Sequence, residues 1–264
     1  MYRLVKSRRK KMKARKLAIT ACAGALIAAM SLTGCGSINP DATVVTINNG
    51  EDTITLGYAN FAARYQQSMY DQYLISYYGE HMWTTETGDD GETMEDETKE
   101  SVLDDMEEQY LCKKHAADYG VTITDDEEAA MTEAAAKFIA DNPEETINMM
   151  GATEEYVREY LEYRTYYSKV SQAVKEAADV SAATVTDEDT ADEDTTEEAT
   201  DTDSEDSDEE EVTVEELQQD YFDDMMDSWK EETTWKVDEG QWKKVKFDDL
   251  FKTIETEEAE DTAE

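Results

Sequence analysis

The most reactive side chains in this chain are three cysteines and two histidines. Thiolates serve as nucleophiles and metal ligands, and imidazoles serve as bases and metal ligands. His81 and His115 have no ligand partner at metal spacing, and Cys112 falls in a helical pattern where a small apolar residue is usual. We therefore expect surface or interfacial histidines, an unreactive Cys112, and no metal or other cofactor.

Carboxylates are far more abundant, with 66 Asp and Glu residues among 264. Asp201, Asp203 and Glu205 match the first liganding positions of an EF-hand calcium loop. However, Asp206 occupies the position that requires glycine, and Val212 occupies that of the bidentate glutamate. Paired carboxylates carry no signal for acid–base catalysis when a quarter of the chain is acidic. We expect weak, diffuse attraction of cations, without a dedicated site and without enzymatic activity.

The amino terminus has the layout of an export signal. Basic residues precede an apolar run from Leu17 to about Leu32, which ends in small residues. An uncleaved transmembrane anchor is the alternative, but the run is shorter than the roughly 20 residues that a membrane span needs.

The run ends in four residues of a recognisable pattern: Leu32, Thr33, Gly34 and Cys35. They resemble the bacterial lipobox, in which diacylglyceryl alkylates the cysteine thiol and the signal is cut before it. The resemblance implies a protein anchored at the extracytoplasmic face of a bacterial membrane, and two acyl chains suit this because one anchors only marginally. Cleavage would also remove Cys22, so Cys112 would be the single remaining thiol and no intramolecular disulfide could form.

The charge balance excludes a large class of partners. Against the acids stand only 24 Lys and Arg residues, and the formal net charge is -42. Because neutralising phosphates requires clustered basic side chains, such a surface repels DNA, RNA and anionic lipid headgroups. We expect no nucleic-acid partner, and a length that suits one domain with tails or two small domains.

Two β segments open the folded part, Val44–Ile47 and Thr53–Leu56, around a tight turn at Asn49-Gly50. Two strands alone are marginally stable in water, so the hairpin needs a third strand or a helix. Thr234–Val237 is the best third strand, although alternation continues beyond it. This pairing would bring the two ends of the folded part together.

Helical periodicity fills most of the remaining chain. The expected helices run from Leu56 to Gly79, from about Val102 to Gly120, from the N-cap Thr124 to Pro143, briefly on to Gly151, from Thr153 to about Ala178, and through Val214 to Trp229. Between Glu80 and Lys99 the glycine and aspartate content predicts a loop without structure. Thr153 can provide only one of the two hydrogen bonds of a capping box, because Tyr156 stands where a capping box has Glu or Gln.

An acidic run, from Val180 to Val212, separates the last two helices. It is almost without apolar side chains, and high charge with low hydrophobicity predicts disorder. We therefore expect a solvated insertion within one domain.

The order of elements and three segments resemble the chaperone domain of the SurA/PrsA-type extracytoplasmic foldases, which trigger factor shares in part. The segments are "INNGEDTITLGYANF", "YGVTITDDEE" and "GATEEYVREYL", within Ala42 to Val174. The resemblance implies a mainly α-helical SurA-like domain with a small β-hairpin or three-stranded element, formed by amino- and carboxy-terminal segments. Those relatives carry a parvulin-type prolyl isomerase domain where this chain has the acidic run.

The expected organisation is a signal peptide at 1–34, a tether at 35–41, the main domain at 42–178, a disordered acidic linker at 179–212, a returning helix and strand at 213–250, and an acidic tail at 251–264. The leading interpretation is a lipoprotein that binds unfolded or newly exported polypeptides without catalysis. Alternatives are a prolyl isomerase with a degenerate catalytic part, or a lipoprotein that binds one specific envelope partner.

Met and aromatic side chains adapt to varied apolar segments, so an excess over the needs of the core would form the binding surface. The candidates for contact with such segments are Tyr65, Met69, Tyr73, Tyr77, Tyr163, Tyr167, Tyr221 and Trp229.

Overall fold

The computed structural model describes residues 38–87, 91–181 and 212–251, which all belong to one compact unit, Ser37–Glu264. The predicted signal peptide, the lipobox residues Leu32 to Cys35, most of the acidic run and most of the predicted tail lie outside the described residues. None of the helices in these ranges has the length and apolarity that a membrane span requires.

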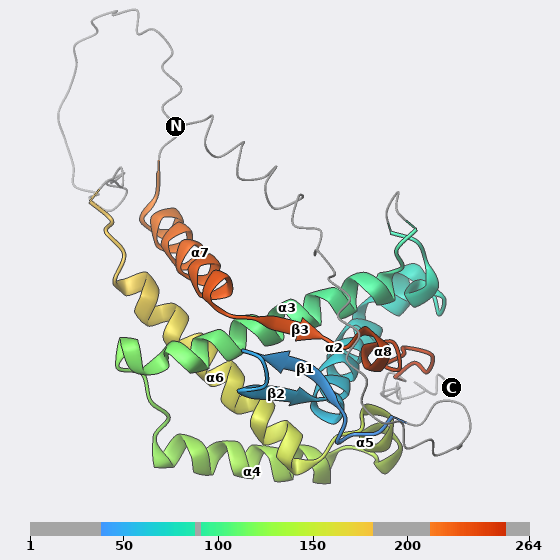
Figure 1. Cartoon of the computed structure of the whole chain (residues 1–264). Helices are drawn as coiled ribbons and strands as arrows, with labels where there is room; N and C mark the ends of the chain where they lie inside the picture. Colours follow the sequence, from blue (N-terminus) through green and yellow to red (C-terminus); the bar gives the residue numbers. More distant parts are fainter. Residues whose placement is uncertain (1–37, 88–90, 182–211, 252–264) are drawn as a thin grey trace, which may run out of the picture. The chain divides into compact units, whose positions relative to one another are not determined.

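A three-stranded antiparallel sheet lies at the centre (Figure 1), formed by β1 Thr43–Ile47, β2 Asp52–Thr55 and β3 Trp235–Val237 in the order β2-β1-β3. Val45 pairs with Ile54 on one side and with Val237 on the other. The predicted hairpin and third strand are confirmed. The turn places Asn48, Asn49 and Gly50 at positive φ, which asparagine and glycine tolerate best.

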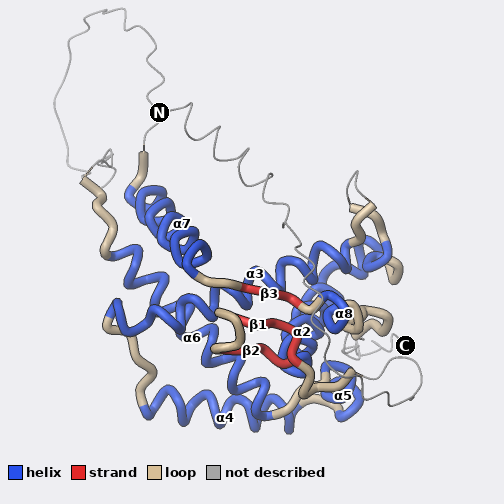
Figure 2. Tube along the Cα trace, in the orientation of Figure 1, coloured by secondary structure: helices blue, strands red, loops and turns tan. Residues whose placement is uncertain are grey.

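Helices surround this sheet and make up most of the described chain (Figures 1 and 2). They are α2 Leu56–Tyr78, α3 Met94–His115, α4 Asp125–Asp141, α5 Glu144–Met150, α6 Glu154–Glu176, α7 Val214–Glu232 and α8 Glu239–Trp242, with 3-10 turns η1 Met82–Thr84 and η2 Ala116–Tyr119. The mainly helical class is thus confirmed.

Threonines begin most of these helices. Thr124 forms a capping box with Glu127, in which each side chain accepts from the other residue's backbone N–H. The same arrangement opens α3 and α7. Thr153 caps α6 through its own side chain alone, as predicted.

The predicted structureless loop at Glu80–Lys99 is wrong. Met82 and Trp83 are buried in η1, Glu86 bridges Thr93, and α3 already begins at Met94. The Trp83 ring packs edge-on against Phe247 at 4.7 Å. Met82 and Trp83 lie in a polar stretch of sequence but pack against residues distant in the chain. The composition of a local window does not reveal such long-range contacts.

The folded part is longer at both ends than predicted. Ile38, assigned to the tether, packs against the core, and the Pro40 carbonyl accepts from the Gly57 amide at 2.9 Å. The alternation after β3 does not continue as strand, because a short helix, α8, follows. Phe251, assigned to the tail, is buried in a second apolar cluster with Phe61.

Buried polar side chains of α2 hold the irregular carboxy-terminal segment, residues 245–251. The Arg64 guanidinium donates to the carbonyl oxygens of Lys246 at 2.7 Å and Asp249 at 3.2 Å. It also donates to the Met149 carbonyl oxygen at 3.3 Å. The Asp71 carboxylate accepts from the backbone N–H of Phe251 at 2.8 Å. Side chains here replace the partners that a regular element would provide.

From α3, Lys99 completes the same arrangement by donating to the Val245 carbonyl oxygen at 2.8 Å. Its Nζ lies 3.5 Å from the buried Glu95 carboxylate, which also accepts from the backbone N–H of Phe247. Lys99 and Glu95 are therefore buried with partners, as buried charges must be.

Cys112 is fully buried, and desolvation raises the pKa of its thiol to about 12. In Gly36–Glu264, where it is the only cysteine, we expect no thiol to react with Ellman's reagent at pH 8 until the chain unfolds, since only the thiolate attacks. The measurement is absorbance at 412 nm with and without guanidinium. Rapid reaction of one thiol in the native protein would contradict this burial.

Candidate functional site

The eight predicted contact residues lie in four environments. Trp229 is buried and stacks on His115 at 4.5 Å between ring centroids, so its prediction as a surface contact is wrong. Tyr163 and Tyr167 are half-buried, and Tyr167 meets the Phe222 ring edge-on at 6.0 Å. Tyr65, Met69, Tyr73 and Tyr77 all lie on one surface of α2. The last of the eight is on α7: Tyr221.

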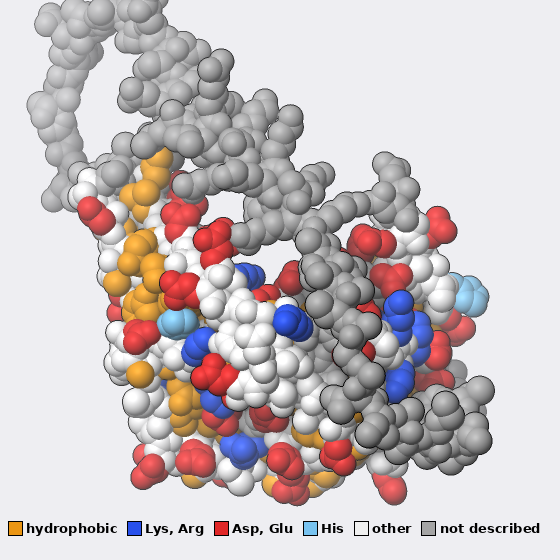
Figure 3. Space-filling view, viewed as in Figure 1, with side chains coloured by type: hydrophobic (Ala, Val, Ile, Leu, Met, Phe, Trp, Pro, Cys, Tyr) orange, Lys and Arg blue, Asp and Glu red, His pale blue; other side chains and the backbone are white. Residues whose placement is uncertain are grey.

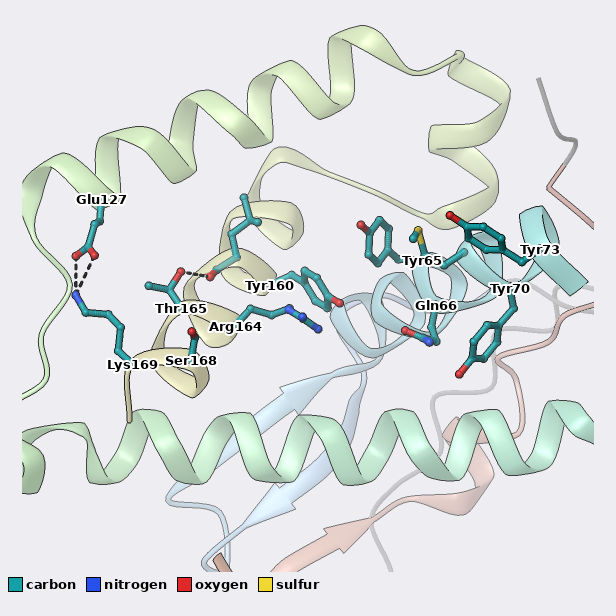
Figure 4. A pocket seen from close by; sticks show the side chains of 12 residues that line it. Tyr65, Gln66, Tyr70, Tyr73, Glu127, Tyr160, Arg164, Thr165, Ser168 and Lys169 are labelled. Atoms are coloured by element: carbon teal, nitrogen blue, oxygen red, sulfur yellow. Dashed lines mark hydrogen bonds and ion pairs between the residues drawn. The ribbon is translucent and has the colours of Figure 1, made fainter. Parts of the chain in front are cut away.

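A groove of about 800 Å³ opens between α2, α4 and α6 (Figure 4). Three of the predicted residues, Tyr65, Met69 and Tyr73, line its α2 wall. Its full lining is Tyr65, Gln66, Met69, Tyr70 and Tyr73 from α2, Glu127 from α4, and Tyr160, Leu161, Arg164, Thr165, Ser168 and Lys169 from α6.

Contacts with neighbouring rings hold the aromatic part of this groove in place. Tyr65 lies 5.3 Å from Tyr160 and 6.1 Å from Phe138, measured between ring centroids. Tyr70 lies 6.1 Å from Trp83, whose indole N–H donates to Asp71 at 2.8 Å. Such rings are already ordered, so a ligand that binds against them pays little conformational entropy.

The aromatic wall continues beyond the groove along α2. Tyr65, Met69, Tyr73 and Tyr77 recur every four residues, and residues at this spacing share one helix face. Exposure rises along the row from 39% at Met69 to 65% at Tyr73 and 83% at Tyr77. An exposed row of large apolar side chains next to a groove is typical of an interaction surface.

An ion pair closes the opposite end of the groove. The Lys169 ammonium lies 2.9 Å from the Glu127 carboxylate and donates to the Thr122 carbonyl oxygen at 2.8 Å. Hydrogen bonds from Thr124, together with Lys169, lower the pKa of Glu127 to about 2. Both charges therefore serve to join α4 to α6.

Arg164 lies between this end and the aromatic part. Its guanidinium is 5.9 Å from the centre of the Tyr160 ring, and Figure 4 shows it directed toward the α2 side of the groove. It also lines an adjoining pocket of about 320 Å³, which includes Asp105 and Gln109 of α3 and Tyr167 of α6. The two pockets share Arg164 and Ser168 in their linings.

Comparison with protein-family models, curated proteins and solved structures finds no match to this chain. The function must therefore be argued from the groove itself. Within residues 38–87, 91–181 and 212–251, no three His, Cys, Asp or Glu side chains are grouped so that they could hold a metal ion.

A second, smaller apolar area lies on α7. Figure 3 shows hydrophobic side chains along the edge formed by α6 and α7, with acidic side chains spread over the rest of that view. Val214 and Tyr221 are 43% and 36% exposed there.

Proposed function

We propose that this chain is an exported lipoprotein, anchored through Cys35, whose folded domain binds unfolded or newly exported polypeptide segments without catalysing prolyl isomerisation. The observation that carries this proposal is the aromatic groove of α2 and α6 with its exposed extension to Tyr77. The resemblance of the sequence to the SurA/PrsA-type chaperone domain supports the same function.

The binding would be reversible apolar contact with low sequence selectivity. Ordered tyrosines provide contact area at low entropic cost, while Met69 adapts to side chains of different shapes. The net charge of -42 would keep a protein with such a surface soluble.

The test is static light scattering of an aggregating, reduced client with and without Gly36–Glu264. We expect suppression that saturates near one domain per client. Replacing Met69, Tyr73 and Tyr77 together by serine should weaken suppression severalfold, because it removes exposed apolar contact area. Exposed residues contribute little to stability, so the variant should remain folded. The control replaces Val214 and Tyr221 by serine and should leave suppression unchanged.

Three results would count against the proposal. No suppression at large excess would remove the chaperone function. Faster proline-limited refolding at catalytic amounts would favour the isomerase alternative. Capture of one dominant envelope protein, together with failure to suppress aggregation, would favour a specific partner.

A further inference from the structure

Arg164 and Lys169 are the two basic residues that line the groove, and they differ in their ion pairs. Lys113, Lys137, Arg158, Lys169 and Lys230 each have a carboxylate within 4.0 Å. Arg164 forms no such ion pair with any carboxylate in the described ranges, although its side chain is exposed. The guanidinium is therefore available to a ligand in the groove.

The surroundings of Arg164 are suited to binding an anion beside an apolar group. The guanidinium lies 5.9 Å from the centre of the Tyr160 ring, and Tyr65 packs edge-on against Tyr160 at 5.3 Å between ring centroids. An aromatic wall excludes water on one side, which strengthens a charged contact relative to bulk water. Lys169, the other cation of the groove, is already neutralised by Glu127.

We propose that Arg164 is the carboxylate-binding residue of the groove, and that the preferred ligands are extended polypeptide segments in which a carboxylate lies beside aromatic or aliphatic side chains. This inference rests on the proposed function and adds to it a preference for segments that carry a carboxylate. Guanidinium and carboxylate groups fit through two parallel hydrogen bonds, a geometry that an ammonium cannot reproduce.

The carboxylate is the side chain of an Asp or Glu residue within the segment, because an extended segment along the groove presents its side chains to Arg164. Asp105 is the carboxylate that the adjoining pocket contributes. Burial raises the pKa of its carboxyl, and the positive charge of Arg164 acts in the opposite direction. A ligand carboxylate would have to share the guanidinium with it.

The experiment uses Gly36–Glu264, which contains every described helix and strand and both apolar clusters. Fluorescence anisotropy compares four labelled versions of one aromatic-rich peptide: internal Glu or internal Gln, each with a free or an amidated carboxy terminus. We expect the internal-Glu peptides to bind about 3- to 10-fold tighter than their internal-Gln counterparts, whereas a preference that follows the free carboxy terminus alone would overturn the assignment to side chains. The two single-carboxylate peptides distinguish the sources.

Three variants test the residue itself. Arg164→Gln should bind all four peptides with equal affinity, and Arg164→Lys should keep only part of the carboxylate preference. Asp105→Asn removes the competing charge and should tighten binding of the carboxylate peptides more than that of the neutral one. Circular dichroism checks that each variant is folded.

Equal affinity of wild-type protein for all four peptides would overturn the inference while the proposed function stands. A carboxylate preference that survives in Arg164→Gln would overturn it as well. Failure of every peptide to bind would overturn the groove as a polypeptide site, and the selectivity inference with it.

Discussion

Replacing Arg64 by methionine should lower the free energy of unfolding by about 3 kcal/mol. Methionine keeps an apolar stem of similar length, but it leaves the carbonyl oxygens of Met149 and Lys246 without their donor, while that of Asp249 keeps the Gln67 side chain. A buried acceptor that loses its partner costs about 1–3 kcal/mol, and hydration of the segment will recover part of the total. The measurement is urea denaturation followed by tryptophan fluorescence and circular dichroism.

The matched control is Arg158→Met. The Arg158 guanidinium lies 3.2 Å from Glu162 on the same helix and is substantially exposed. Such pairs contribute about 0.3–0.5 kcal/mol, so this variant should differ little from wild type. If both arginine variants lost the same stability, the hydrogen bonds of Arg64 would not be what holds the carboxy-terminal segment.

The largest effect of a core substitution is expected at Trp229→Ala, at about 3–5 kcal/mol. Its indole is 4% exposed, stacks on His115 with an angle of 4° between the rings, and meets Tyr119 edge-on at 6.0 Å. Removing it opens a cavity where α3, η2 and α7 meet. Chemical denaturation with a circular dichroism readout gives the loss directly.

Tyr221→Ala, on the same helix, is the control for Trp229→Ala. Tyr221 is 36% exposed, so we expect a loss below about 1 kcal/mol. At temperatures where both variants remain folded, neither should change client binding if the groove of α2 and α6 is the binding surface. A loss of stability at Trp229 no larger than that at Tyr221 would contradict its place in the core.

Local signals in the sequence predicted most of the helix boundaries. Thr124, Pro143 and Gly151 each act on the backbone within a few residues, through capping, a missing N–H or a left-handed conformation, so their effects can be read without a fold. The third strand was also predicted, because the hairpin lacked a partner and one alternating segment remained; its pairing with β1 in particular comes from the structure.

Long-range packing could not be predicted in the same way. Helical periodicity gives the residues that share a face, but it does not say whether another element covers that face. The row through Tyr73 is exposed, whereas the row through Trp229 is covered by α3 and η2. For the same reason Trp83 was missed as a core residue and Arg164 as a groove residue.

The position of β1 bears on the order in which the chain can fold. Its neighbours are β2, which follows within a few residues, and β3, which lies almost at the end of the domain. A chain that emerges from its amino terminus can form the hairpin early, but the sheet stays incomplete until Trp235–Val237 arrive. Contacts of such long sequence separation slow folding, because the loop must close before they stabilise it.

The buried polar side chains of α2 also lack native partners until the end of the domain has emerged. Until residues 245–251 arrive, Arg64 lacks two of its three backbone partners and Asp71 lacks the backbone N–H of Phe251. Early intermediates must therefore keep this side of α2 hydrated, and the final cooperative step must join the first and last parts of the domain. The domain would complete its own fold only after nearly its whole length has emerged, and until then it would itself be an unfolded polypeptide exposed to aggregation.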